Sequence, residues 1–89
     1  MNKNIKNEII RLIKNLSNKK IKDLKTNQLI VGDLLDSFDM IKFISALEEK
    51  FKVKFNTKDL SIYNFEKIDR ITKLVRSKMK WILEKSLEN

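Results

Sequence analysis

The 89-residue chain contains no cysteine, no histidine and no proline, and it has one glycine, Gly32. Without cysteine it has no disulfide and no cysteine-based metal site. Without histidine it lacks the base that most often takes the proton from a nucleophilic serine. Because proline and glycine are the residues least compatible with helices, their near absence favours an all-α fold.

Long apolar runs are also missing. No run approaches the roughly 18 residues of a membrane span, so we expect no stable membrane insertion. The N-terminal segment, residues 1–6, is basic because it contains two lysines. The sequence after it is interrupted by the charged residues Glu8, Arg11 and Lys14, so it contains no apolar segment of the kind that a signal peptide requires. We therefore expect a cytoplasmic protein. Its length predicts a single domain, residues 1–89, with residues 80–89 as a helical C-terminal extension.

The net charge of +8 is unevenly distributed: residues 1–30 carry +6, residues 31–50 carry −3 and residues 51–89 carry +5. A basic protein invites a nucleic-acid interpretation, since lysine neutralises phosphates. However, 17 of the 20 basic residues are lysines scattered along the whole chain, and no nucleic-acid motif is present. A solvated lysine-rich surface is the expected outcome, with no nucleic-acid partner.

Apolar residues at helical spacing predict four helices, over residues 4–16, 37–50, 64–68 and about 69–84. Between the first two lies a long loop, residues 18–36, in which Gly32 supplies a turn. Its spaced apolar residues are expected to pack onto the core. They are Ile21, Leu24, Leu29, Ile30, Leu34 and Leu35.

The stretch after Phe51 alternates polar and apolar residues over positions 52–55. No partner strand is visible, so we interpret it as an extended connector with Val53 or Phe55 held in the core, followed by one turn at residues 56–60. In the last helix, Trp81 is expected to cover the bundle in preference to contacting a partner or a membrane surface.

The chain is organised around Asp36 and Ser37, which precede an amphipathic helix. Both residue types are good N-caps, because a short side-chain oxygen accepts a hydrogen bond from an N–H of the first turn. The spacing predicts one apolar helix face. That face is Phe38, Ile41, Ile44, Leu47 and Phe51, with Phe43 beside it.

This placement presents the Ser37 hydroxyl at the start of a helix, beside the carboxylates of Asp36 and Asp39. The simplest interpretation is a helix cap and nothing more. If the hydroxyl has a chemical role, Ser37 is better suited to be the substrate of another enzyme than a catalyst, because no base accompanies it. We therefore expect no catalytic residues, no metal site and no enzymatic activity.

Two segments, residues 34–39 (Leu-Leu-Asp-Ser-Phe-Asp) and residues 46–51 (Ala-Leu-Glu-Glu-Lys-Phe), together with the later Asn-Phe-Glu-Lys-Ile at residues 64–68, resemble the acyl carrier protein signature. The resemblance runs from the first helix to about Met79. The Leu-Leu-Asp-Ser form of the motif is similar to that of free-standing specialised carriers, including D-alanyl carriers. It implies a four-helix carrier-protein bundle with a long first loop and a short third helix.

In that family the matching serine carries 4′-phosphopantetheine, so the resemblance implies covalent attachment at Ser37. A phosphopantetheinyl transferase (holo-carrier synthase) would supply the group from coenzyme A with Mg²⁺, making the chain a phosphoprotein. The thiol of this cofactor holds acyl or aminoacyl groups as thioesters. An acyl-loading ligase or acyltransferase and downstream enzymes of fatty-acid, polyketide or related lipid biosynthesis are the implied partners. A monomer is expected.

The resemblance also implies two sets of supporting residues. The expected partner-recognition residues are Asp36, Phe38, Asp39, Met40, Ile41 and Glu48. The candidates for lining an acyl-chain cavity are Ile41, Phe43, Ile44, Leu47, Phe65, Ile68 and Ile71. For each residue of the second set taken singly, an ordinary core position is the stronger interpretation.

Two departures from the family pattern concern partner choice. Lys42 stands where an acidic residue is common, and Phe38 stands where leucine is usual. Charge complementarity governs association rate and partner choice, so we expect a dedicated set of partners instead of the general fatty-acid synthase. Two other functions stay open: an unmodified helical adaptor protein, and a basic helical nucleic-acid-binding protein.

Overall fold

The computed structural model describes residues 4–17 and 29–88, with side chains described up to Ile82. Four helices occur in this part of the chain, which confirms the predicted all-α fold. They are α1 (Ile5–Leu16), α2 (Ser37–Phe51), α3 (Ile62–Phe65) and α4 (Ile68–Glu88). In none of them is there an apolar stretch long enough to cross a membrane.

Side-chain caps define where three of the helices begin. Asn4, Asp36 and Ser61 each accept a hydrogen bond from the backbone N–H three residues ahead, which satisfies one of the free donors of the first turn. The end of α2 is set by Lys52, whose φ of 56° is left-handed. Its N–H donates to the Glu48 carbonyl, and the chain leaves the helix direction there.

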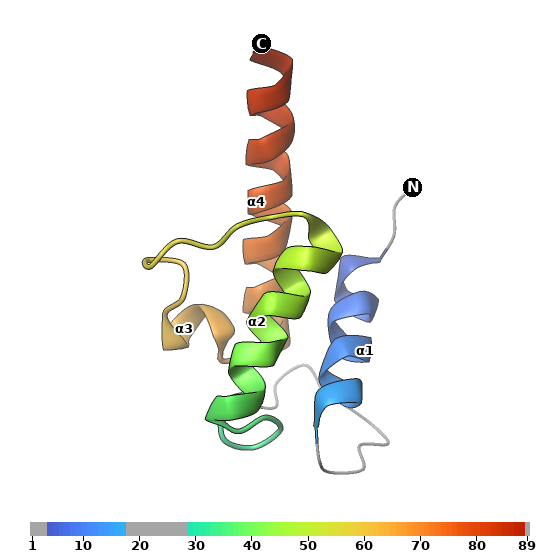
Figure 1. Cartoon of the computed structure of the whole chain (residues 1–89), viewed down its shortest axis with the longest axis vertical. Coiled ribbons are helices and arrows are strands. Elements are labelled where there is room, and N and C mark those ends of the chain that lie inside the picture. The colour runs from blue at the N-terminus through green and yellow to red at the C-terminus, as the bar shows by residue number, and fades with distance from the viewer. Residues whose placement is uncertain (1–3, 18–28, 89) are drawn as a thin grey trace.

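The helices surround one core. α1 packs against both α2 and α4, and α3 packs against α4. Figure 1 shows α1 and α2 side by side, α3 at the flank, and α4 continuing beyond the other helices towards the C-terminus. The core consists of Ile9, Ile13, Ile30, Leu34, Leu35, Met40, Phe43, Leu47, Phe65, Ile68, Ile71 and Val75.

The described part of the long first loop packs onto the core as predicted. Ile30, Leu34 and Leu35 are buried, whereas Leu29 is largely exposed, and Ile21 and Leu24 lie outside the described residues. The predicted turn at Gly32 is confirmed by its φ of +93°, a conformation that disfavours residues with a side chain.

The boundaries of the last two helices differ from the prediction. α3 spans residues 62–65 and not 64–68, because the Ser61 hydroxyl accepts from the Asn64 N–H and starts the helix earlier. α4 begins at the buried Ile68 and extends to Glu88, beyond the predicted end at Glu84.

The connector after α2 is extended and its apolar residues face the core, as predicted. Val53 is buried, and half-buried Phe55 meets Phe65 edge-to-face with 5.5 Å between ring centroids. The predicted turn follows: Asn56 and Asp59 each accept the other's backbone N–H on a side-chain oxygen, at 2.9 and 2.8 Å. These two bonds close the turn locally.

An ion pair ties this turn to α4. Lys78 Nζ lies 2.6 Å from Asp59 Oδ2, and both side chains are mostly shielded from water. Partial burial alone would raise the pKa of Asp59. The hydrogen bond from Lys78, the hydrogen bond from the Asn56 N–H and the lysine charge together outweigh burial, so the pKa lies below its ordinary value.

This pair predicts a pH-dependent part of the stability. A lowered native-state pKa stabilises the fold fully above the unfolded-state pKa of about 3.9, and the contribution is lost as the pH falls through the native-state value. The free energy of unfolding of Asp59→Asn should therefore fall less than that of the wild type on acidification below about pH 4, by up to about 1 kcal/mol.

Urea titrations between neutral and strongly acidic pH measure this difference. Glu49→Gln is the matched control, because Glu49 is an exposed carboxylate on α2 and the substitution removes the same charge. The control should keep the wild-type pH dependence. An Asp59→Asn variant that loses stability with acid as steeply as the wild type contradicts the assignment.

Candidate functional site

A hydrogen-bonded turn positions the start of α2. The Ile30 N–H donates to the Glu66 carbonyl at 2.9 Å, and the Ile30 carbonyl accepts from the N–H groups of Leu34 and Leu35 at 3.1 and 2.9 Å. Ser17, at the end of α1, donates its hydroxyl to the Leu34 carbonyl at 2.9 Å. The turn that precedes the Asp36-Ser37 pair is thus joined, through Ile30 and Leu34, to two other parts of the bundle.

Within the pair, the structure shows which residue caps α2 and which presents an exposed hydroxyl, a question that the sequence left open. Asp36 is the N-cap, and its Oδ1 accepts from the Asp39 N–H at 2.8 Å. Ser37 is the first helical residue and is exposed. Because the cap is occupied by Asp36, the Ser37 hydroxyl is not needed for capping and faces solvent.

The Ser37 hydroxyl has no side-chain hydrogen-bond partner among the described residues, so none of these side chains is positioned as a base for it. The same residues contain no cluster of three or more metal-binding side chains. The hydroxyl is accessible, so an enzyme that brings its own base can reach it.

Large apolar side chains surround this position on the outside of α2. Phe38 and Ile41 are each 65% exposed, and the Lys42 ammonium lies 4.8 Å from the centroid of the Phe38 ring. These two residues of the predicted apolar face therefore do not face the core. The buried face of α2 is formed by Met40, Phe43 and Leu47, which pack into the core cluster.

The predicted partner-recognition residues fall into three groups by exposure. Asp36, Phe38 and Ile41 are on the surface. Asp39 and Met40 are buried beneath it, so their side chains do not contribute to the exposed face. Glu48 is half-buried, and its Oε2 accepts the Phe55 N–H at 2.9 Å, which gives this carboxylate a structural role.

The predicted cavity residues are mostly brought together. Phe43, Leu47, Phe65, Ile68 and Ile71 belong to one buried cluster, and Ile44 packs against it. Ile41 does not, because it points outward. Two surface pockets, of about 410 and 310 Å³, lie elsewhere and are lined by none of these residues.

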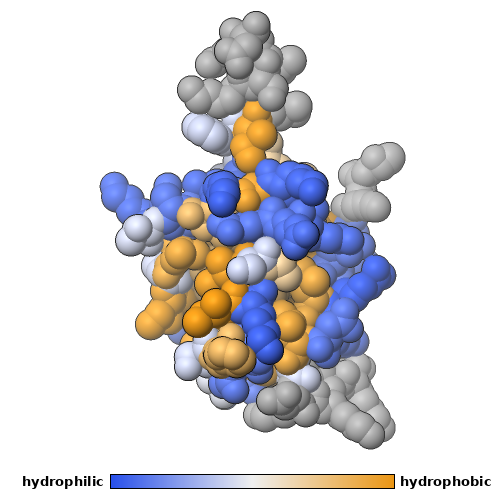
Figure 2. Space-filling model, in the orientation of Figure 1, coloured by the Kyte–Doolittle hydropathy of each residue, from blue (hydrophilic) through white to orange (hydrophobic). Residues whose placement is uncertain are grey.

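A second group of exposed apolar residues, which was not predicted from the sequence, lies at and before α3. Leu60, Ile62 and Tyr63 are exposed, and the Arg70 guanidinium stacks 3.9 Å from the Tyr63 ring centroid. In Figure 2, hydrophobic surface gathers over α3 and the first turns of α2. The sequence feature that could have located the start of α3 is Ser61, because serine is a good N-cap and its side chain accepts the Asn64 N–H.

Comparison with known proteins adds no identification. No family model matches the chain, and no curated protein matches it. The resemblance to acyl carrier proteins therefore stays a prediction.

The division of roles between Asp36 and Ser37 is testable through stability. Asp36→Ala removes the cap and should lower the free energy of unfolding by about 1 kcal/mol. Ser37→Ala removes an exposed hydroxyl and should change it by less than about 0.5 kcal/mol. Chemical denaturation of the wild type and the two variants measures these differences and shows which residue caps α2. A larger loss for Ser37→Ala than for Asp36→Ala contradicts the cap assignment.

Proposed function

We propose that the protein is an acyl carrier and that Ser37 is the attachment site of 4′-phosphopantetheine. One observation carries the proposal: Ser37 is exposed at the first position of α2, next to a cap that a different residue provides. A hydroxyl in this place can be modified without loss of a structural hydrogen bond.

The residues around Ser37 suit this role in separate ways. Asp36 fixes the first turn of α2, and the turn at residues 30–35 fixes Asp36, so the acceptor oxygen has a defined position. The start of a helix also favours a negatively charged group, such as the phosphodiester that attachment creates. Exposed Phe38 and Ile41 offer apolar contacts to the modifying enzyme.

In the attachment reaction, the Ser37 oxygen forms a bond to the phosphorus that bears the pantetheine arm of coenzyme A. The bond from that phosphorus to the adenosine bisphosphate breaks, and the serine proton goes to a base of the transferase. The attached group supplies a thiol, which explains how a cysteine-free chain can hold acyl groups as thioesters.

Attachment is tested by the intact mass of the protein after incubation with coenzyme A, Mg²⁺ and a broad-specificity phosphopantetheinyl transferase. The wild type should gain the mass of one phosphopantetheine group, and Ser37→Ala should gain none. Ser45→Ala is the matched control, because Ser45 is another exposed serine on α2 and its loss should leave the mass gain unchanged.

Circular dichroism of each variant shows that it is folded, so a missing mass gain can be assigned to the side chain. No mass gain in the folded wild type contradicts the proposal and favours the unmodified adaptor. A gain that persists in Ser37→Ala contradicts the assignment of the site.

The surface beside Ser37 supports dedicated partners. Lys42 is exposed one turn along α2 and covers the Phe38 ring, so an incoming enzyme meets a cation next to the modified serine. A partner that presents its own cations to an acidic carrier is repelled there, and repulsion of this kind lowers the association rate.

A housekeeping acyltransferase of fatty-acid synthesis should load this protein more slowly than it loads its own carrier. Lys42→Glu should raise the loading rate severalfold, with the largest effect at low salt. Lys80→Glu makes the same charge change at an exposed position on the projecting part of α4 and should leave the rate almost unchanged. Equal loading of this protein and the native carrier contradicts the idea.

A further inference from the structure

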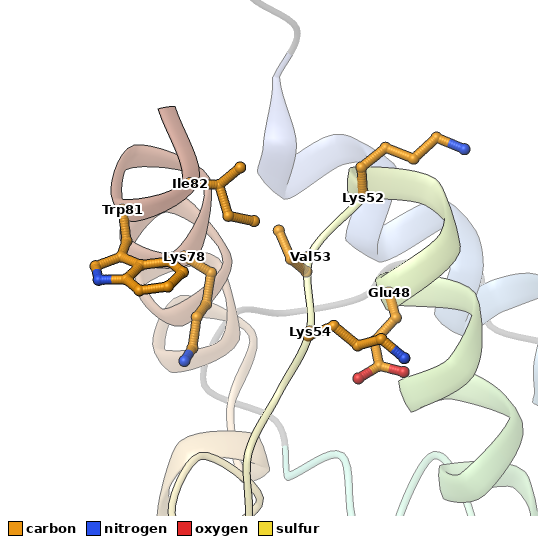
Figure 3. A pocket seen from close by; sticks show the side chains of 7 residues that line it. All are labelled: Glu48, Lys52, Val53, Lys54, Lys78, Trp81 and Ile82. Carbon is orange, nitrogen blue, oxygen red and sulfur yellow. The ribbon is translucent and has the colours of Figure 1, made fainter. Parts of the chain in front are cut away.

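A second surface lies at the other end of α2 from Ser37. A groove of about 410 Å³ runs between the connector that follows α2 and the projecting part of α4. α2 has 15 residues, so roughly 20 Å of helix separates this groove from Ser37. Figure 3 shows Val53 and Ile82 pointing towards each other across the groove, with Trp81 on the flank of α4.

The wall of the groove is apolar. Val53 is buried, Ile82 is half-buried, and Trp81 is 57% exposed, so the expectation that Trp81 covers the bundle is wrong for most of its surface. Trp81 lies where α4 extends past the other described helices (Figure 1). A concave apolar surface of this size fits one large apolar side chain.

The charge around the groove is strongly positive. Residues 52–82 include nine basic and three acidic side chains. All three carboxylates are engaged in ion pairs: Asp59 with Lys78, Glu66 with Arg70, and Asp69 with Lys6. The groove itself is lined by one carboxylate, Glu48, whose Oε2 accepts the Phe55 N–H, and by three lysines. Lys78 is paired with Asp59, whereas Lys52 and Lys54 are exposed and form no ion pair with any described residue. They are available to an external anionic group.

We propose that this groove binds an acidic segment of a partner protein, which inserts one apolar side chain between Val53, Trp81 and Ile82. The concave shape favours a peptide segment over a flat membrane surface. The positive charge favours an acidic segment over a second copy of this +8 chain. Lys52 and Lys54 contact the carboxylates that flank the inserted side chain.

This inference is independent of the proposed carrier function. The groove contains none of the exposed residues beside Ser37, and Glu48 is its one lining residue within α2, so Ser37→Ala should bind the segment as the wild type does. A failure of one proposal therefore leaves the other standing.

Trp81 is the only tryptophan of the chain, so its fluorescence reports on this groove directly. The full-length protein is titrated with a synthetic peptide of aspartate and glutamate residues around a central Leu-Phe pair, free of tryptophan and tyrosine. The emission should shift to shorter wavelength and saturate, because the ring becomes shielded from water. Replacing the Leu-Phe pair with serines should abolish the shift.

Two double variants separate the groove from general electrostatic attraction. Lys52→Glu/Lys54→Glu should weaken binding about tenfold or more. Lys14→Glu/Lys73→Glu changes the net charge equally at exposed positions outside the groove and should weaken it far less. Circular dichroism verifies folding, and Lys54→Gln provides a milder change if the double variant is unfolded.

Three results overturn the proposal. One is the absence of a saturable shift with the acidic peptide. Another is an equal effect of the two double variants. The third is a larger shift, at matched charge concentration, with phosphatidylglycerol vesicles or a single-stranded oligonucleotide, which would assign the surface to a membrane or to nucleic acid.

Discussion

The hydrogen bonds of the turn at residues 30–35 are the constraint on which the rest of the site depends. Ile30 uses its N–H to join the segment after α3 and its carbonyl to close the turn, and Ser17 joins the same turn to the end of α1. These bonds satisfy backbone groups beside buried side chains, where an unpaired group costs about 1–3 kcal/mol. The position of Asp36, and hence of Ser37, follows from them.

From this constraint the two surfaces of α2 acquire different roles. With its start fixed, α2 turns Met40, Phe43 and Leu47 inward, and it leaves Phe38 and Ile41 outside. At its other end, the left-handed Lys52 directs the chain into the connector and forms one side of the basic groove. One helix thus presents an exposed serine with apolar neighbours at one end and a cationic, tryptophan-bearing groove near the other.

Much of the fold could be predicted from local patterns. Helical spacing located α1, α2 and most of α4, and alternation in residues 52–55 located an extended connector, because these elements follow from nearest neighbours in the chain. The outward position of Phe38 and Ile41 could not be predicted this way. Their spacing is compatible with a buried face, and only the packing of Met40 and Phe43 decides the rotation of α2.

The site shows the same division. Asp36 and Ser37 are both good caps by residue type, and the hydrogen bond to the Asp39 N–H, seen only in three dimensions, assigns the cap to Asp36. The groove could not be predicted from local sequence patterns, since its walls come from segments nearly 30 positions apart, such as Val53 and Ile82. The exposure of Trp81 depends on how far α4 extends beyond the other described helices.

The most direct test of the central claim is to locate a modification on the protein itself. The protein is purified from cells that express a phosphopantetheinyl transferase, digested, and sequenced by tandem mass spectrometry. The account predicts a phosphopantetheine group on the peptide that contains Ser37, with the fragment ions placing it on that residue. A folded protein that leaves the cells unmodified, or that carries the group on another serine such as Ser45, contradicts the account.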